Sequence, residues 1–471
     1  MGGTLLRITA WTAASVIAFV LYIPPTAGAQ SLPAAPRARI INLTPRAGFF
    51  DEPSIAVDPA HPKRVVAAYQ VPAHAAYSRD SGRAWKRARG VADPNYRMSG
   101  DVSVTFGRNG FAFLCYIAFD QLGTANYWAH NATRNGIFVR RSPDGGITWQ
   151  APVQVIAHPT APHIPFEDKP YIVADNTHSP FAGNLYIGWT HFTLTDSEIY
   201  FSRSTDDGAE WSKPIRISVH QGLPRDDNGA VEGFDGTVGA HGTLYVVWTD
   251  GEHIVFTLSK DGGKTFEPAR DIIATAPPYF HVFDVSRANG FPQIGIGPSK
   301  EGPARLYVTW SDYRNGDVDV FCSNSNNGGE TWAPAVRVNN DALHNGDDQF
   351  FQWLAVDPVT GAANVIFYDR RGDPANRWTR VVLARSTNGG KSFVNYAWNR
   401  RAFDAHGDFI GDYTGLAAYD NRVYGAWTEE GAGRDAAAAD SNGGSAPPSV
   451  PAFFPRRRTT VRAGVADFSK H

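Results

Sequence analysis

Acidic side chains stand at the start of several strand-like runs in this 471-residue sequence. The positions are Asp51, Glu52, Asp101, Asp168, Asp235, Asp348 and Asp412. Carboxylates that a fold brings close together raise one another's pKa, and such a pair can act as general acid and general base. Their oxygen atoms can equally bind Ca²⁺. The structural alternative is that each carboxylate only closes a turn where its strand begins.

A second group of charged residues follows the next strand-like runs. It comprises Arg314, Arg370, Arg371 and Glu429. An arginine can hold a carboxylate through two parallel hydrogen bonds, so these arginines are candidates for binding an acidic sugar. An ion pair with a neighbouring aspartate, such as Asp369, is the structural alternative.

A repeat indicates which elements position these residues. Six segments follow the pattern Ser-x-Asp-x-Gly-x-x-Trp, with Asn or Phe as variants, and begin at Ser78, Ser142, Ser204, Ser259, Ser325 and Ser386. The pattern predicts a tight turn, because Asp or Asn accepts hydrogen bonds from backbone amides and Gly supplies a positive φ. The aromatic residue then covers the turn. Six copies, spaced 55 to 66 residues apart, predict a repeat fold.

Four strand-like runs occur in each period, which predicts an all-β propeller of four-stranded antiparallel blades. Counting the innermost runs gives seven blades, whereas counting the boxes alone gives six, the alternative. The seventh blade would take its inner strands from residues near 412 and 422 and a third strand near 459. The N-terminal run at residues 39–44 would supply its outer strand and close the ring.

The chain begins with the pattern of a secretory signal peptide, predicted at residues 1–29. Arg7 is followed by an apolar stretch over residues 8–23 and by an Ala27-Gly-Ala29 cleavage site. An uncleaved membrane anchor is the alternative. We expect a leader at residues 30–37, a single propeller domain over residues 38–471 and a flexible insertion at residues 431–450, which is rich in Gly, Ala, Ser and Asp.

Composition bounds the partners. The formal net charge of −2 gives no reason to expect nucleic acid or an anionic membrane as a partner. Cys115 and Cys322 are the only cysteines and are expected to be buried free thiols. We expect a monomer, secreted to the periplasm or the extracellular space, with no membrane association after signal cleavage.

The six turns resemble the Asp-box (BNR) repeats of the sialidase superfamily. Residues 51–59, 367–374 and 409–416 are further similar to secreted bacterial proteins described as sialidase-like or exo-α-sialidases. The resemblance implies a functional face opposite the boxes. It also implies a tyrosine nucleophile activated by a glutamate, for which Tyr413 and Glu429 are the candidates. The first inner strand reads Glu52-Pro-Ser-Ile where sialidases have an Arg-Ile-Pro motif.

The sequence therefore predicts a glycan-acting enzyme, most simply a glycoside hydrolase. The candidate catalytic residues are Tyr413, Glu429, Asp101, Asp168 and Asp235, and the candidate substrate-binding residues are Arg314, Arg370, Arg371, Asp348 and Glu52. Two alternatives are a non-catalytic propeller that binds glycan, protein or metal, and a polysaccharide lyase that uses Tyr127 and His130. No cofactor is required by any of these, although Ca²⁺ fits the carboxylates.

Overall fold

The computed structural model describes residues 31–44, 46, 48–93, 95–124, 126–276, 279–298, 304–399, 401–431 and 458–469. The predicted signal peptide and nearly all of the predicted insertion at residues 431–450 lie outside these residues. Within the described part, no helix has the length and apolar character needed to cross a bilayer.

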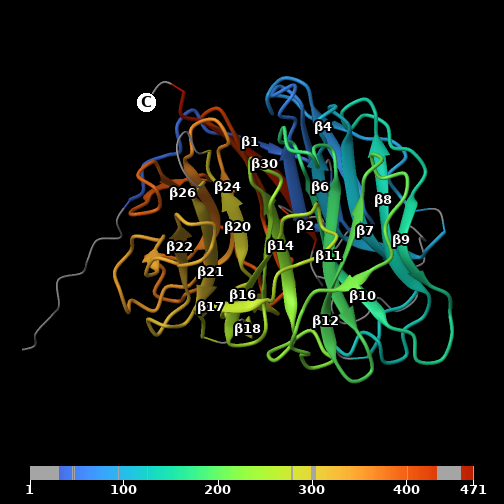
Figure 1. The fold of residues 1–471 in the computed structure, drawn as a ribbon. Helices are drawn as coiled ribbons and strands as arrows, with labels where there is room; N and C mark the ends of the chain where they lie inside the picture. The colour runs from blue at the N-terminus through green and yellow to red at the C-terminus, as the bar shows by residue number, and fades with distance from the viewer. Residues whose placement is uncertain are drawn as a thin grey trace, which may run out of the picture.

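Seven four-stranded antiparallel sheets form the blades of a propeller, as the count of inner strands predicted (Figure 1). The first three blades are β2 (Asp51–Val57), β3 (Val65–Gln70), β4 (His74–Ser78) and β5 (Lys86–Arg87); β6 (Met98–Phe106), β7 (Ala112–Phe119), β8 (Asn135–Ser142) and β9 (Val153–His158); and β10 (Phe166–Ala174), β11 (Leu185–Phe192), β12 (Ser197–Ser204) and β13 (Ile215–Arg216).

The next three blades are β14 (Glu232–Val238), β15 (Leu244–Thr249), β16 (His253–Ser259) and β17 (Arg270–Ala274); β20 (Gln293–Ile296), β21 (Leu306–Asp312), β22 (Asp319–Ser325) and β23 (Val336–Arg337); and β24 (Gln349–Val356), β25 (Ala363–Asp369), β26 (Arg380–Ser386) and β27 (Val394–Ala397). A small two-stranded sheet, β18 (Tyr279–Phe280) with β19 (Ala288–Asn289), stands in the connection between the fourth and fifth blades.

Both ends of the described chain contribute to the seventh blade. It runs in the order β1 (Arg39–Asn42), β30 (Thr459–Asp467), β29 (Arg422–Glu430) and β28 (Gly415–Tyr419). The register of β1 on β30 runs from Arg39 opposite Val465 to Asn42 opposite Arg462. The predicted closure by an N-terminal strand is therefore confirmed. Ahead of β1, Ala34 forms a parallel bridge with Ala397 on the sixth blade.

The apolar core lies between neighbouring blades. Each cluster of buried residues combines strands of adjacent sheets, as where Val66 and Ala68 of the first blade pack with Val104 and Leu114 of the second. Four second strands place a tryptophan in this core, and Trp189, Trp248, Trp310 and Trp427 are almost completely buried. The second strands are thus largely apolar on both faces because a blade lies on either side.

The boxes form the predicted turns. In the fourth copy, Asp261 Oδ1 accepts hydrogen bonds from the amides of Lys264 and Thr265 at 2.9 and 3.0 Å, and from the Ser259 hydroxyl at 2.8 Å. Gly263 has a φ of +78°, which favours glycine. These turns join the third and fourth strands, so they lie at the end of each blade away from the start of its inner strand.

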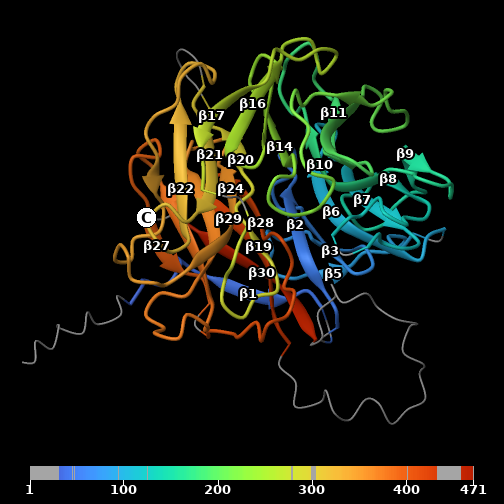
Figure 2. The same ribbon diagram turned by 90° about the horizontal axis from the view of Figure 1, so that it is seen from below.

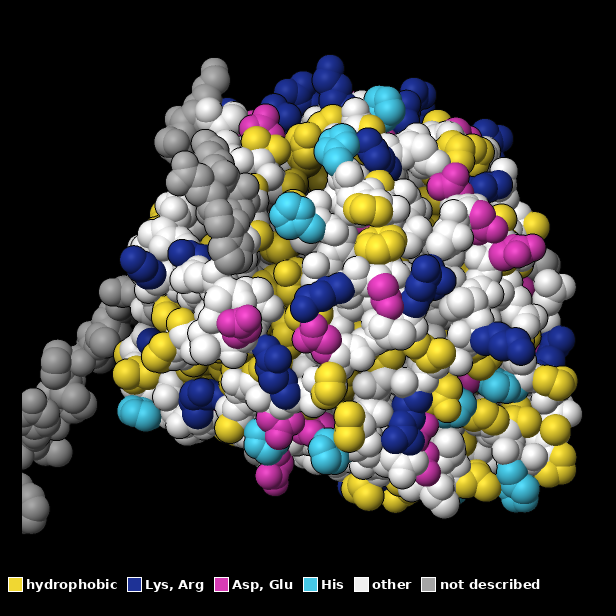
Figure 3. Space-filling model, viewed as in Figure 1, with side chains coloured by type: hydrophobic (Ala, Val, Ile, Leu, Met, Phe, Trp, Pro, Cys, Tyr) yellow, Lys and Arg dark blue, Asp and Glu magenta, His cyan; other side chains and the backbone are white. Residues whose placement is uncertain are grey.

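The inner strands surround the propeller axis. Figure 2 shows β2, β6, β10, β14, β20, β24 and β28 gathered in the middle of the molecule, with outer strands such as β9, β17 and β27 at its periphery. Side chains at the starts of seven strands can therefore converge on one opening. On the face seen in Figure 3, lysine, arginine and acidic side chains are interspersed, without a large area of one sign.

Candidate functional site

A β-bulge recurs near the start of the inner strands. In five blades the register against the second strand shifts across the same place, for example between Asp51 and Ser54 and between Gly100 and Ser103. One residue in each bulge has a positive φ: Glu52 (48°), Asp101 (45°), Lys169 (46°), Gly233 (78°) and Phe351 (52°). A bulge re-aims the side chain it carries, and non-glycine residues adopt this conformation only under strain.

A cavity of about 550 Å³ opens over these bulges, at the end of the blades away from the Asp-box turns. Its acidic lining residues are Glu52, Asp101, Asp168, Asp226, Asp227 and Asp412, its basic ones are Lys169 and Arg287, and its aromatic ones include Phe119, Trp128, Tyr279, Phe280 and Phe409. A concave site with an apolar wall and a few converging polar groups is the usual form of a small-ligand site.

Two cations hold the floor of the cavity together. Lys169 Nζ lies 2.5 Å from Asp412 Oδ2. The Arg287 guanidinium donates to Asp412 Oδ1 at 2.9 Å and also bonds to Asp412 Oδ2 and to Asp226. Although burial raises it, the charges of Arg287 and Lys169 hold the pKa of Asp226 below its usual value. Both cations are therefore already paired with carboxylates of the protein.

Glu232 lies behind Asp226, and its pKa differs in direction. The Tyr279 hydroxyl lies within hydrogen-bond distance of Glu232 Oε2, at 2.7 Å, and of Asp226 Oδ1, and its one hydrogen can be donated to either of them. Burial, followed by the negative charge of Asp226, raises the pKa of Glu232 well above its usual value. Neighbouring carboxyl groups in one site thus hold protons with unequal strength, as acid–base chemistry requires.

Gln70 connects the two acidic bulge residues of the first and second blades. Its side-chain amide group donates to Glu52 Oε2, and its carbonyl oxygen accepts the Asp101 amide. Glu52 Oε1 accepts the Asp412 amide at 3.0 Å, and Asp101 Oδ2 accepts the Lys169 amide at 3.1 Å. Burial, and next the charge of Asp101, raises the pKa of Glu52 well above its usual value.

Three predicted site residues, Glu52, Asp101 and Asp168, line this cavity. Burial and the adjacent Asp101 carboxylate raise the pKa of Asp168 well above its usual value. Two others, Asp235 and Tyr413, line a space of about 50 Å³ beneath it, which shares Lys169 and Asp412 with the cavity. Burial raises the pKa of Asp235 to about 7 and, with the charge of Glu52, raises that of Tyr413 well above its usual value.

The remaining predicted residues lie outside this lining and have partners of their own. Arg314 pairs with Asp312, and Arg371 pairs with Asp369. Arg370 donates to the carbonyl oxygens of Phe283 and Asn376 and to Thr379. The ion pairs of Arg314 and Arg371 match the structural alternative, whereas Arg370 bonds to neutral oxygen atoms. A role of these arginines in binding substrate stays a prediction.

Asp348 and Glu429 are likewise engaged elsewhere. Asp348 accepts hydrogen bonds from the Val318 amide and the Asn376 side chain at 3.0 and 2.6 Å. Glu429 accepts from the Trp427 indole at 2.8 Å and from Arg462 at 3.1 Å. Neither of these residues lines the cavity or the space that contains Tyr413.

The loop with the lyase candidates reaches the cavity through one residue. Trp128 lines it, whereas Tyr127 and His130 do not. Their rings pack 5.0 Å apart, and His130 Nε2 lies 3.1 Å from the Leu194 carbonyl oxygen.

Three residues of the cavity were not anticipated: Asp226, Tyr279 and Arg287. All lie in connections between blades, outside the strand starts where carboxylates were sought. For Tyr279 and Arg287 the sequence offered one indication, the unusual length of the connection from β17 to β20. This connection contains an aromatic pair at residues 279–280 and the basic residue Arg287.

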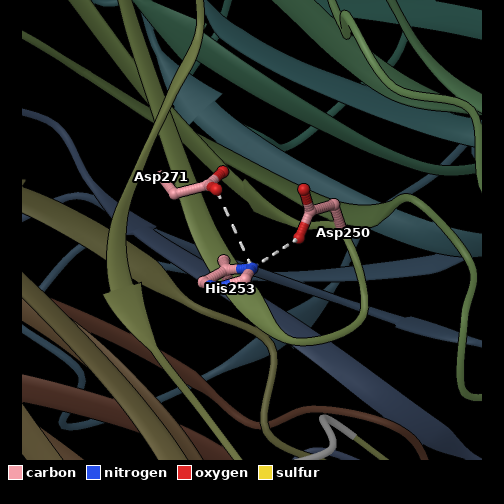
Figure 4. A group of neighbouring side chains, drawn as sticks. All are labelled: Asp250, His253 and Asp271. Carbon is pink, nitrogen blue, oxygen red and sulfur yellow. Dashed lines mark ion pairs between the residues drawn. The ribbon is translucent and has the colours of Figure 1, made fainter.

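Three groups of side chains in the described residues have the proximity needed to hold a metal ion. One, Asp168, Asp226 and Glu232, belongs to the cavity wall. In another, Asp404 and Asp284 already pair with Arg377. The third lies on the fourth blade, where His253 Nδ1 is 3.7 Å from Asp250 and 3.8 Å from Asp271 (Figure 4).

The chain matches no protein-family model and no curated protein. Similar solved structures include a Hadza microbial sialidase, with 15% identity and a TM-score of 0.45 over 77% of this chain and 70% of that one. The NanB sialidase from Streptococcus pneumoniae has 9% identity and a TM-score of 0.46, over 77% of this chain and 80% of that one. A PL25 ulvan lyase has 12% identity and a TM-score of 0.48, over 82% of this chain and 93% of that one. Similarity at this level does not extend to substrate or mechanism.

Proposed function

We propose that the protein is a secreted glycoside hydrolase that binds a glycan in the cavity. The observation that carries the proposal is the pair Glu52 and Asp101. They occupy the same bulge position in adjacent blades, both line the cavity, and one glutamine side chain contacts both.

Hydrolysis of a glycosidic bond needs a protonated carboxyl group and an ionised one. Glu52 suits the first role, because burial and the charge of Asp101 favour its protonated form. In the proposed reaction Glu52 protonates the glycosidic oxygen as its bond to the anomeric carbon breaks. Asp101 accepts a proton from the water that attacks that carbon, and its charge stabilises the positive charge developing there.

The lining indicates a neutral glycan. Aromatic side chains such as the half-buried Phe280 and Phe409 offer flat apolar surfaces against which the C–H faces of a sugar ring can pack. A sugar carboxylate would need a free guanidinium group. Arg287 is the one arginine among the described lining residues, and it is bonded to Asp226 and Asp412. We therefore expect neutral substrates to be preferred over sialosides.

The test is release of sugar from a panel of neutral and sialylated glycans by the purified protein. Glu52→Gln and Asp101→Asn should each lower kcat by about 10²- to 10⁴-fold, the usual contribution of a general acid or base. Asp271→Asn, on the surface of the fourth blade, is the matched control and should behave as the wild type.

Other outcomes assign other functions. Release of sialic acid that is lost in Tyr413→Phe but kept in Glu52→Gln would favour the sialidase prediction. Unsaturated products would indicate a lyase. Binding of glycan without any turnover would indicate a non-catalytic binding propeller.

A further inference from the structure

The cavity wall around Lys169 and Arg287 contains more acidic than basic groups. Asp412 and Asp226 pair directly with these two cations, and Asp168 and Glu232 stand beside Asp226. If all four carboxylates were ionised, the two cations would leave two negative charges uncompensated. Buried charges of one sign are costly unless a counter-ion or bound protons neutralise them.

Three of these carboxylates have the spacing of an ion site. Asp168, Asp226 and Glu232 each place one oxygen so that all three atoms lie within 4.8 Å of one another. Calcium–oxygen distances are about 2.3–2.6 Å, so one ion between these atoms can reach all of them. Mg²⁺ holds its ligands at about 2.0–2.1 Å in a near-ideal octahedron, which this spacing suits less well.

The wall also contains an oxygen atom that lacks a partner. Glu232 is fully buried, and Tyr279 contacts its Oε2, whereas no N–H or O–H donor of the described residues reaches its Oε1. A buried acceptor left unpaired is costly, so this atom needs either a proton shared with the neighbouring Asp226 carboxyl group or a ligand. Asp168 and Asp226 line the cavity, which gives an ion a path to the site.

We propose that Asp168, Asp226 and Glu232 bind one Ca²⁺ ion in the wall of the cavity. The donors are all carboxylate oxygens, which suit a hard cation and not Zn²⁺ or Cu²⁺. One divalent ion would also balance the charge of all four carboxylates in their ionised form. Asp226 can take part although Tyr279 and Arg287 contact it, because each carboxylate oxygen has two lone pairs.

Three protein oxygens leave part of the coordination shell open toward the cavity, since Ca²⁺ takes six to eight ligands. Two adjacent hydroxyl groups of a sugar can fill it, so the ion would orient the glycan beside Glu52 and Asp101. This orienting role rests on the proposed function, whereas binding of the ion does not.

The experiment measures Ca²⁺ binding to the chelator-treated protein by calorimetry, without substrate. One ion per molecule and a higher Tm in Ca²⁺ are expected. Glu232→Gln, which keeps an acceptor for Tyr279, should weaken Ca²⁺ binding at least tenfold. Asp168→Asn should weaken it to the same degree and replaces Glu232→Gln if that variant does not fold. Asp271→Asn tests the surface group of Figure 4 and should leave binding unchanged.

Absence of Ca²⁺ binding to the folded wild type would overturn the proposal. Binding that is lost in Asp271→Asn but kept in Glu232→Gln and Asp168→Asn would overturn it as well, by assigning the ion to the surface. Because no substrate is present, neither result bears on whether the protein hydrolyses glycans.

Discussion

Lys169 Nζ lies 2.5 Å from Asp412 Oδ2, although the two residues are 243 positions apart, Lys169 in the third blade and Asp412 in the connection just before β28 of the seventh. Only 8% and 1% of their side chains are exposed. Removing one partner of a buried ion pair costs about 3–5 kcal/mol, because the other charge stays buried. We expect Lys169→Met to lower the free energy of unfolding near the bottom of that range, since Arg287 still contacts Asp412. Urea unfolding at neutral pH measures this.

A double-mutant cycle with Asp412→Asn separates the pair from the general effect of each substitution. The double variant should lose clearly less unfolding free energy than the sum of the losses in the two single variants. Strictly additive losses would mean that the two residues do not stabilise the ring as a pair.

The pH dependence of hydrolysis should identify Glu52 as the acid. Its pKa lies above the ordinary value of 4.5 because of burial and the charge of Asp101. The acid must be protonated, so kcat should fall as pH rises through the raised pKa of Glu52. In Glu52→Gln the residual rate should lack this alkaline decline. An unchanged decline in the variant would assign it to another group.

Asp51 should make stability depend on pH in the opposite sense from a typical paired carboxylate. Burial, reinforced by Asp412 and Asp101, raises its pKa from 3.8 to about 8. The folded state therefore favours the protonated form, and its contribution to stability, present below pH 4, is lost as pH rises toward 8. The substituted side chain does not titrate, so the free energy of unfolding of Asp51→Asn should rise relative to that of the wild type as pH rises over this range.

For a single proton the gain cannot exceed about 1.4 kcal/mol per pH unit. Unfolding of both proteins in urea at pH 5 and pH 8 provides the comparison, because the titration of the other groups cancels between them. Equal stability differences at both pH values would contradict the raised pKa.

Two substitutions of Asp261, in the Asp box of the fourth blade, should lower stability to different degrees. Asp261→Ala removes the acceptor for two amides and two hydroxyl groups and should cost about 1–2 kcal/mol. Asp261→Asn should cost less, because Asn327 and Asn388 serve at the same position in two other boxes. Calorimetric Tm values rank the variants, and an equal loss in both would mean that the turn needs the charge.

Protonation of Asp261 at low pH should destabilise this turn as Asp261→Ala does. Although burial opposes it, hydrogen bonds from Thr265 and Ser259 lower the pKa of Asp261 to about 2. The stability that the carboxylate contributes is thus present above pH 4 and is lost as pH falls through 2. The difference between wild type and Asp261→Ala should shrink in that range.

The fold was predictable because each box is a local turn whose residues are set by hydrogen bonds within eight positions. The closing strand was predictable for a different reason: residues 39–42 had no other place in the count of strands. The bulges were not visible, and they explain one misplacement. Asp235 follows the bulge residue Gly233 by two positions, so it lies in the space beneath the cavity and not at its opening.

The candidate site was predictable only where it belongs to strands. Glu52, Asp101 and Asp168 stand at the starts of inner strands, whose position in the blade follows from the repeat. Arg287 and Asp226 reach the cavity from connections of irregular length, and no periodic pattern places them. Arg314 and Arg371, by contrast, each follow an aspartate by two residues and pair with it.

The pairing of β1 with β30 also bears on how the molecule is made. Residues 39–42 can pair with residues 462–465 only after the six intervening blades have been synthesised, so this long-range contact is among the last to become available. Such high contact order slows folding. A chain that closes its ring late remains unfolded for longer during synthesis, which would suit the export that the sequence predicts.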